Sequence, residues 1–221
     1  MTEKRYESDL TSKEKRQLEL EKIKGMSWKD RIAYIWAYYK PHMAVGIGII
    51  AVLCVIGQMI YRSQFDTVFY AVIMNGGAGD SAAMADDFKT YIGDEDKYHE
   101  ITMDSSMFFT GDDNADYTSV MKLTTLIGAR EIDAMIATKE EFESYAEMDA
   151  FVRMEELLTE EQMEMYGDSV SEYGIHVTSS SKLEEFGLTP GEDAYLAVFI
   201  YSENVDNAKS FIKYICEGGK S

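Results

Sequence analysis

The chain has 221 residues, a formal net charge of −19 and two cysteines, Cys54 and Cys216. Such an acidic balance repels nucleic acid and anionic surfaces, so we expect no nucleic-acid partner. The two cysteines fall in segments that we place on different sides of a membrane boundary below. We therefore predict no disulfide and expect a hydrophobic core to hold the fold.

Residues 1–24 are dominated by charged side chains. A segment of this composition cannot bury enough apolar surface to build a core. We expect a charged cytoplasmic tail that is either disordered or a solvated helix, with docking of a cytoplasmic protein as the alternative.

Residues 25–42 are predicted to form a juxtamembrane amphipathic helix, which Ser27 can cap and Pro41 should break. One face of this helix carries a stripe of apolar side chains at helical spacing. The stripe consists of Trp28, Ile32, Ile35, Trp36 and Tyr39. Trp and Tyr favour the headgroup level of a lipid bilayer, so the stripe predicts a helix lying on the inner leaflet. Docking of a cytoplasmic protein on the same stripe is the alternative.

Residues 43–61 are 19 residues without a charged side chain. As a helix they would span about 28 Å, close to the thickness of a bilayer core, and we predict one transmembrane helix. The apolar run is too long, and too far from the start of the chain, for a cleaved signal peptide. Leu53 precedes Cys54 where a lipoprotein signal needs a small residue. We therefore predict an uncleaved signal anchor.

Charge differs sharply across this segment. Residues 1–42 carry ten Lys and Arg against seven Asp and Glu, whereas residues 62–221 carry eleven against 33. Basic residues near the end of a membrane helix mark the cytoplasmic side. We predict a single-pass plasma-membrane protein with a cytoplasmic N-terminus and an extracytoplasmic C-terminal domain.

After a connector at residues 62–66, residues 67–221 are predicted to form one extracytoplasmic domain. Strand-like and helix-like patterns alternate along it. The strand candidates are residues 67–74, 98–103, 132–137, 173–177 and 194–201. The helix candidates are residues 80–92, 117–129, 139–146, 151–158, 160–166, 181–186 and 205–216. This alternation predicts the α/β class with a mostly parallel sheet.

The turn after the first strand matches a loose dinucleotide-binding pattern through Gly77, Gly79 and Ala82, and Asp104 ends the next strand where a ribose-binding acid would lie. Asp80, however, would place a negative charge at the helix end that should receive the pyrophosphate. A plain glycine turn is the favoured interpretation, and another ligand held at this strand end is the alternative.

Neither a metal site nor a catalytic site is predicted. Asp112, Asn114 and Asp116 begin like a calcium loop but lack its glycine and its final glutamate. The three histidines are spread along the chain without metal-ligand spacing, and no serine lies in a nucleophile elbow. We expect no cofactor, no metal ion and no enzymatic activity.

Two segments of the outer domain resemble type II periplasmic solute-binding proteins. They are residues 130–158 (REIDAMIATKEEFESYAEMDAFVRMEELL) and residues 194–215 (AYLAVFIYSENVDNAKSFIKYI). The N-terminal SWKDRIAYIWAYYKPH, with its membrane helix, is similar to the anchor of single-pass proteins of Gram-positive bacteria. The resemblance implies a periplasmic-binding-like domain whose pocket would be lined by Asn75, Gly76, Ser105 and Thr138. Two-lobed members of that family are much longer than this domain.

These patterns predict a membrane-anchored extracytoplasmic binding or interaction module without catalytic activity. Its expected partners are the lipid bilayer and an envelope or membrane protein. The alternative is a solute-binding-like receptor for a small ligand at the strand ends.

Overall fold

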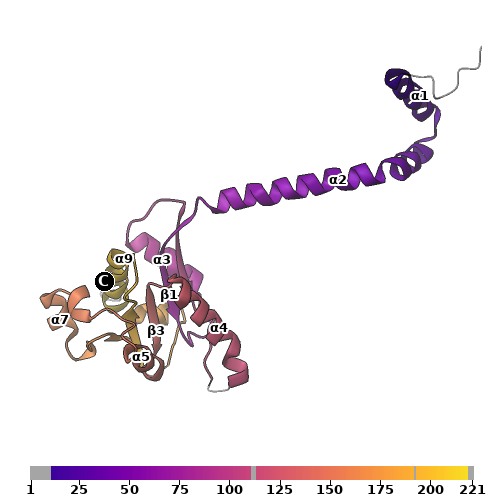
Figure 1. Ribbon diagram of the computed structural model, residues 1–221. Coiled ribbons are helices and arrows are strands. Elements are labelled where there is room, and N and C mark those ends of the chain that lie inside the picture. The colour runs from indigo at the N-terminus through magenta and orange to yellow at the C-terminus, as the bar shows by residue number, and fades with distance from the viewer. Residues whose placement is uncertain (1–10, 111–112, 192, 219–221) are drawn as a thin grey trace, which may run out of the picture. The chain divides into compact units, whose positions relative to one another are not determined.

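A computed structural model describes residues 11–110, 113–191 and 193–218 of the chain. The chain divides into two compact units, residues 1–63 and residues 64–221 (Figure 1). The first unit contains helices α1 (Ser12–Gly25) and α2 (Trp28–Arg62). Thr11 and Glu14 form a capping box at the start of α1. Part of the charged tail is therefore helical, and residues 1–10 lie outside the described residues.

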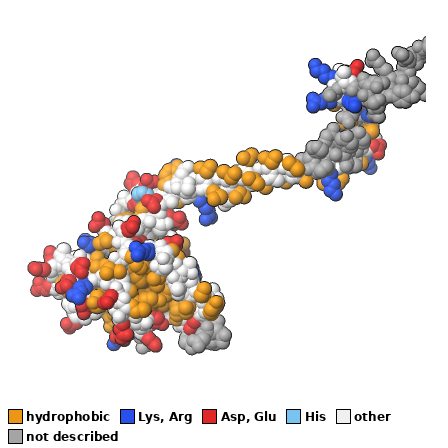
Figure 2. Space-filling view, viewed as in Figure 1, with side chains coloured by type: hydrophobic (Ala, Val, Ile, Leu, Met, Phe, Trp, Pro, Cys, Tyr) orange, Lys and Arg blue, Asp and Glu red, His pale blue; other side chains and the backbone are white. Residues whose placement is uncertain are grey.

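Helix α2 runs without interruption through the predicted break at Pro41. That prediction was wrong. A proline removes one backbone donor and crowds the preceding turn, but the remaining hydrogen bonds can carry a helix past it. Within α2, Met43–Arg62 has a mean hydropathy of 2.5 and no part of it is buried in the protein. Apolar side chains cover this segment (Figure 2). By length and composition it is one helix that can cross a membrane.

The second unit is a mixed α/β domain around one five-stranded sheet. The strands are β1 (Asp66–Ile73), β2 (His99–Asp104), β3 (Ala134–Thr138), β4 (Ile175–His176) and β5 (Ala194–Val198). Their order across the sheet is β2-β1-β3-β5-β4. β1 pairs in parallel with β2 and β3, whereas β5 is antiparallel to β3 and β4. The predicted α/β class and mostly parallel sheet are confirmed, and only β5 runs in the opposite direction.

Helices cover both faces of the sheet. They are α3 (Ser81–Tyr91), α4 (Asp113–Ala129), α5 (Lys139–Ala146), α6 (Met154–Leu157), α7 (Glu160–Tyr166), α8 (Ser181–Glu185) and α9 (Val205–Glu217), with a 3-10 turn at Gly167–Ser169. The predicted helix at 151–158 is reduced to α6. Phe151 instead forms a β-bridge with Phe199, because this segment runs beside the end of β5.

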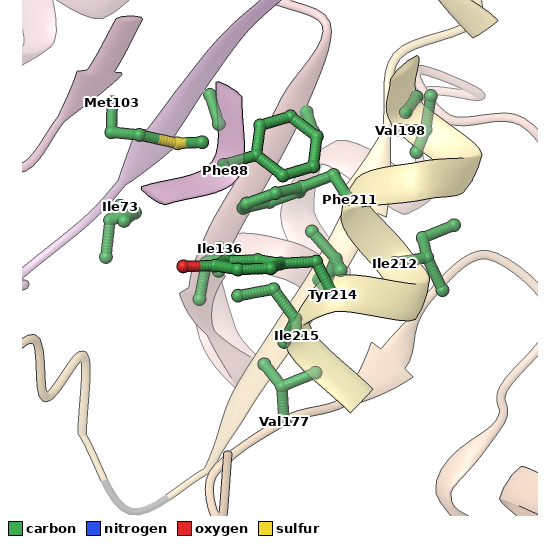
Figure 3. Close-up of a cluster of buried hydrophobic side chains, with 14 of the residues drawn as sticks. Ile73, Phe88, Met103, Ile136, Val177, Val198, Phe211, Ile212, Tyr214 and Ile215 are labelled. Atoms are coloured by element: carbon green, nitrogen blue, oxygen red, sulfur yellow. The ribbon is translucent and has the colours of Figure 1, made fainter. Parts of the chain in front are cut away.

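Two hydrophobic cores lie on opposite faces of the sheet, and β1 contributes alternate side chains to each. Phe69, Ala71 and Ile73 face the first core, whereas Val72, and Met74 directly after the strand, face the second. In the first core, rings from α3 and α9 point toward one another, including Phe88, Phe211 and Tyr214 (Figure 3). The predicted inward face of the last helix (Ala208, Phe211, Ile212 and Ile215) is confirmed as buried. α4 and α5 cover the second core through Leu123 and Phe142.

One polar cluster at the rim of the first core should make stability depend on pH. The Tyr214 hydroxyl donates a hydrogen bond to Asp87 Oδ2 at 2.7 Å, and Lys182 Nζ lies 2.9 Å from the same oxygen. These two donors hold the pKa of the Asp87 carboxyl below its ordinary value. A lowered folded-state pKa stabilises the fold above the unfolded-state value, about 3.9 for Asp, and this contribution is lost as the pH falls through the folded-state value.

We therefore expect Asp87→Asn to destabilise the protein by a constant amount from pH 7 to about pH 5, and by less below about pH 4. Chemical unfolding in detergent, followed by near-ultraviolet circular dichroism at each pH, measures the difference. Asp86→Asn, at an exposed neighbouring position, is the control and should change the free energy of unfolding little. A difference that persists unchanged down to pH 2 would contradict the assigned role of Asp87.

Candidate functional site

The predicted ligand residues lie at one edge of the sheet. Asn75 and Gly76 follow β1, Ser105 follows β2, and Thr138 is the last residue of β3. These strands are parallel neighbours, so their carboxyl ends meet at the same edge. A Cβ built on Gly76 would lie 3.0 Å from Ser105 Cβ. Ile73 pairs with Ile136 in the β1–β3 register, and Asn75 and Thr138 each follow that pair by two residues. The structure thus brings all four residues to one edge of the sheet.

The side chain of Asn75 is engaged by the protein itself. Its φ of 54° is a left-handed conformation that asparagine tolerates. Its N–H donates to the Met107 carbonyl at 2.9 Å, and its Oδ1 accepts from the Phe109 N–H at 2.7 Å. Asn75 therefore fixes the loop that follows β2, and its side-chain amide oxygen already accepts a hydrogen bond from the protein. A binding role for this strand edge stays a prediction.

The glycine turn between β1 and α3 is packed against the protein's own backbone. A Cβ on Gly79 would lie 2.5 Å from the Phe186 carbonyl oxygen and 2.6 Å from the carbonyl of Gly187. Asp80 caps α3 by accepting a hydrogen bond from the Ala83 N–H at 2.9 Å. These contacts support the plain glycine turn. The backbone of residues 186–187 and the Asp80 carboxylate occupy the position that a pyrophosphate would need.

Asp104, the candidate ribose-binding acid, is also occupied by neighbouring groups. It accepts hydrogen bonds from the Tyr70 hydroxyl at 3.0 Å and from the Ser106 N–H at 2.9 Å, and it pairs with Lys122 of α4. Burial alone would raise its pKa, but the bonds from Lys122 and Ser106 hold the pKa below its usual range. Asp104 therefore ties α4 to the sheet as a carboxylate.

No metal centre is found among the side chains that the structure describes. His99 lies between two carboxylates, 2.8 Å from Asp94 and 3.9 Å from Asp96, and His176 lies 3.1 Å from Asp193.

The calcium-like loop falls partly outside the described residues, which include neither Asp112 nor the side chain of Asn114. Its third member, Asp116, is buried and accepts hydrogen bonds from the N–H and hydroxyl of Thr110. Asp116 therefore closes its own loop.

An open cavity of about 330 Å³ lies beside the buried Asp133. Asp133 accepts hydrogen bonds from the Tyr70 N–H at 2.8 Å, the Ser202 hydroxyl at 2.6 Å and the Asn204 amide at 3.2 Å. Its oxygens thus fasten β1 to the chain that follows β5. This arrangement is structural, because the hydrogen-bond donors of the buried Asp133 carboxylate all come from the protein itself.

A second open cavity, of about 260 Å³, is lined by Tyr166, His176, Ser179 and Cys216 among others. The Tyr166 hydroxyl donates to Glu217 at 2.6 Å, and His176 Nε2 also lies 3.0 Å from the Thr178 hydroxyl. The Tyr166 and His176 side chains are thus bonded to neighbouring groups of the protein.

The outer flank of α4 exposes an apolar stripe. Tyr117 is 64% exposed, Val120 46% and Met121 49%, and their i, i+3, i+4 spacing makes them neighbours. Phe108, 45% exposed, lies against the same helix, because its N–H donates to Ser119 of α4 at 3.1 Å. Hydrophobic side chains gather over this region of the domain (Figure 2). We call these four residues the α4 patch. Together they expose on the order of a few hundred Å², the size of the largest apolar patch on a typical monomer, which is often functional.

The predicted membrane-interface stripe lies on the first turns of α2. Trp28, Ile32 and Trp36 are exposed, as an interfacial stripe requires. The side chains of Ile35 and Tyr39 lie outside the part of the chain that the structure describes.

These features define the class of protein that the structure supports: a mixed α/β domain joined to one helix able to span a membrane. Comparison of the chain with models of protein families, with curated proteins and with solved structures finds no match in any of the three.

The α4 patch was missed by the sequence analysis, although a signal for it exists. α4 carries apolar residues on two flanks, at 123, 126 and 127 and at 117, 120 and 121. A helix on the surface of a sheet buries one stripe only. A second stripe on such a helix therefore predicts an exposed apolar surface.

Proposed function

We propose that this chain is a single-pass membrane protein whose extracytoplasmic domain binds a protein partner through the α4 patch. The apolar run of α2 supports membrane anchoring. The excess of Lys and Arg before it, and of Asp and Glu after it, supports a cytoplasmic N-terminus. Catalysis forms no part of the proposal, because the polar clusters described above bind their own chain.

The α4 patch is the observation that carries this proposal. Its side chains are large and apolar, and Tyr and Met are enriched at protein interfaces. Residues 62–221 hold 33 acidic against eleven basic residues, so an approaching partner meets a strongly negative field. A partner with an apolar contact surface and a basic rim complements both features. A second copy of this chain carries the same negative charge and is the less favourable occupant.

A receptor for a small ligand is the second candidate. The convergence of Asn75, Gly76, Ser105 and Thr138 at one sheet edge favours it, as does the resemblance to type II periplasmic solute-binding proteins. Two contacts count against it. The hydrogen bond from Phe109 occupies the side-chain oxygen of Asn75, and the close approach of Gly76 to Ser105 leaves little room for a ligand at that edge.

Site-specific photo-crosslinking in cells tests the proposal. A benzoylphenylalanine placed at Val120 or at Met121 of the full chain should yield the same adduct with one partner protein. The same probe at Met165, an exposed apolar position on α7, is the matched control and should yield none. With the partner purified, Val120→Asp should weaken binding at least tenfold, and added salt should weaken binding to the unchanged protein.

Three outcomes would overturn the proposal: no adduct at either α4 position, equal adducts at Met165, or adducts only with a second copy of the chain. A thermal shift of the full chain with amino acids, sugars or peptides, lost in Ser105→Leu, would instead support the small-ligand receptor.

A further inference from the structure

Beyond its covalent anchor, the domain presents a second group of residues suited to a membrane surface. Phe65 and Tyr98 meet edge to face, with ring centroids 5.8 Å apart and planes at 78°. Lys97 Nζ lies 4.5 Å from the centroid of the Tyr98 ring. Phe65 remains 36% exposed and Lys97 is exposed. Aromatic rings beside a lysine match the composition of the membrane interface.

The loop that carries Lys97 and Tyr98 is held in place by its own bonds. The Tyr98 N–H donates to Asp96 Oδ1 at 2.9 Å, and the Tyr98 carbonyl accepts from the Asp66 N–H at 2.9 Å. Lys89 Nζ donates to the Asp96 carbonyl at 2.7 Å. A loop fixed in this way presents its side chains with little entropy left to lose on contact.

The covalent chain places this cluster close to the end of the apolar helix. Phe65 follows Arg62, the last residue of α2, by three positions. Three residues span at most about 11 Å, and the headgroup layer extends roughly 5–8 Å beyond the hydrocarbon core. The backbone of Phe65 therefore lies in the headgroup layer or at most about 6 Å beyond it, so its ring can reach that layer wherever α2 crosses a bilayer.

We infer that Phe65, Lys97 and Tyr98 rest on the headgroup layer of the leaflet from which the chain emerges. The two rings take the interfacial level that aromatic side chains favour, and Lys97 faces lipid phosphate.

Acidic side chains surround the cluster and would be repelled by lipid phosphate, so only the aromatic rings and Lys97 are expected to contact the headgroups. Asp94 and Asp96 turn carboxylate oxygens toward N–H groups of their own loop, whereas Glu95 and Asp66 are exposed. The contact should therefore be stronger on zwitterionic than on anionic vesicles.

This inference rests on the proposed membrane anchoring, and quenching of tryptophan by brominated lipids tests both separately. In the full chain, Trp28→Phe and Trp36→Phe remove the two native tryptophans, and Tyr98→Trp introduces a single one. This variant is reconstituted into phosphatidylcholine vesicles. Flotation with the vesicles reports anchoring. Lipids brominated near the headgroup should quench this probe at least twofold more than lipids brominated deep in the acyl chains. Lys97→Glu should reduce the quenching.

Tyr117→Trp, in the α4 patch, is the matched control and should be quenched at least twofold less. Phe65→Trp is a second probe of the cluster, for use where Tyr98→Trp disturbs the loop. Protein that floats with vesicles but shows equal or no quenching at positions 65, 98 and 117 would overturn the membrane contact and leave the anchor intact. Protein that does not float would overturn both.

Discussion

Replacing Gly79 by alanine is expected to lower the free energy of unfolding by about 2–4 kcal/mol, because the added methyl group meets backbone rather than a movable side chain. Its Cβ would stand 2.5 Å from the Phe186 carbonyl oxygen. The same oxygen accepts a hydrogen bond from the Asp80 N–H at 2.9 Å. Relief of the clash must move two backbone segments apart and weaken that bond. Chemical unfolding of the full chain in detergent, followed by circular dichroism, measures the loss.

Gly128→Ala is the matched control for Gly79→Ala. Gly128 lies in α4, and a Cβ there would meet nothing within 4 Å. An alanine in a helix is favoured over glycine by up to about 1 kcal/mol, so this variant should be slightly more stable than the unchanged protein. If Gly79→Ala proved as stable as Gly128→Ala, the close packing of the turn against residues 186–187 would be refuted.

The role of Gly79 shows why a motif can match and still mislead. A glycine pattern in the sequence states that backbone must come close to something, but not to what. Here the approaching group is a carbonyl more than a hundred residues further along the chain. Asp80 was the better guide, because an acid at that position suits a helix cap and opposes a phosphate.

The central strands could be predicted because their sequence environment is uniform. β1 is buried on both faces, so its residues read as an unbroken apolar run of the kind expected for a parallel strand. β5 was predicted at residues 194–201 but ends at Val198. Ile200 continues the apolar run, yet its N–H bonds to the Ala150 carbonyl and its side chain is exposed. Apolar letters alone do not mark where a strand leaves the sheet.

Neither the direction of β5 nor the choice of which apolar flank of α4 faces outward could be predicted. Both depend on contacts between segments far apart in the sequence. Asp133 illustrates the difficulty: it was placed inside a strand, whereas it precedes β3 and binds Tyr70 and Asn204 from distant segments. Likewise, the periodicity of α4 cannot decide whether Leu123 or Val120 faces the sheet, because both flanks carry apolar residues.

The common position of the predicted ligand residues follows from the topology, whereas a ligand role for them stays a prediction. Parallel strands end at one edge, and this rule places Asn75, Gly76, Ser105 and Thr138 there. Whether such residues face a ligand depends on the loops above them. The Phe109 N–H in the loop after β2 donates to the side-chain amide oxygen of Asn75. No local sequence pattern predicts a hydrogen bond between residues 34 positions apart.

Phe211→Ala is the variant for which the largest loss of stability is expected, about 3–5 kcal/mol, as for other fully buried phenylalanines. Phe211 is fully buried, and its ring centroid lies 5.1 Å from that of Phe69 on β1 and 5.3 Å from that of Phe88 on α3. The truncation leaves a cavity between three elements that cannot all move inward together, because β1 is held between β2 and β3. Unfolding in detergent measures the effect.

Lys209→Ala, at an exposed position on the same helix, is the control and should change stability by less than about 0.5 kcal/mol. A loss below about 1 kcal/mol for Phe211→Ala would mean that α9 does not close the first core. If the expected loss is found, the domain depends on its last helix, because Phe211 joins the first strand and the first helix of the domain to residues near the end of the chain. The α4 patch is the exposed flank of α4, the helix that covers the second core through Leu123. Substitutions there, such as Val120→Asp, should therefore weaken partner binding at least tenfold without the loss of stability that Phe211→Ala produces.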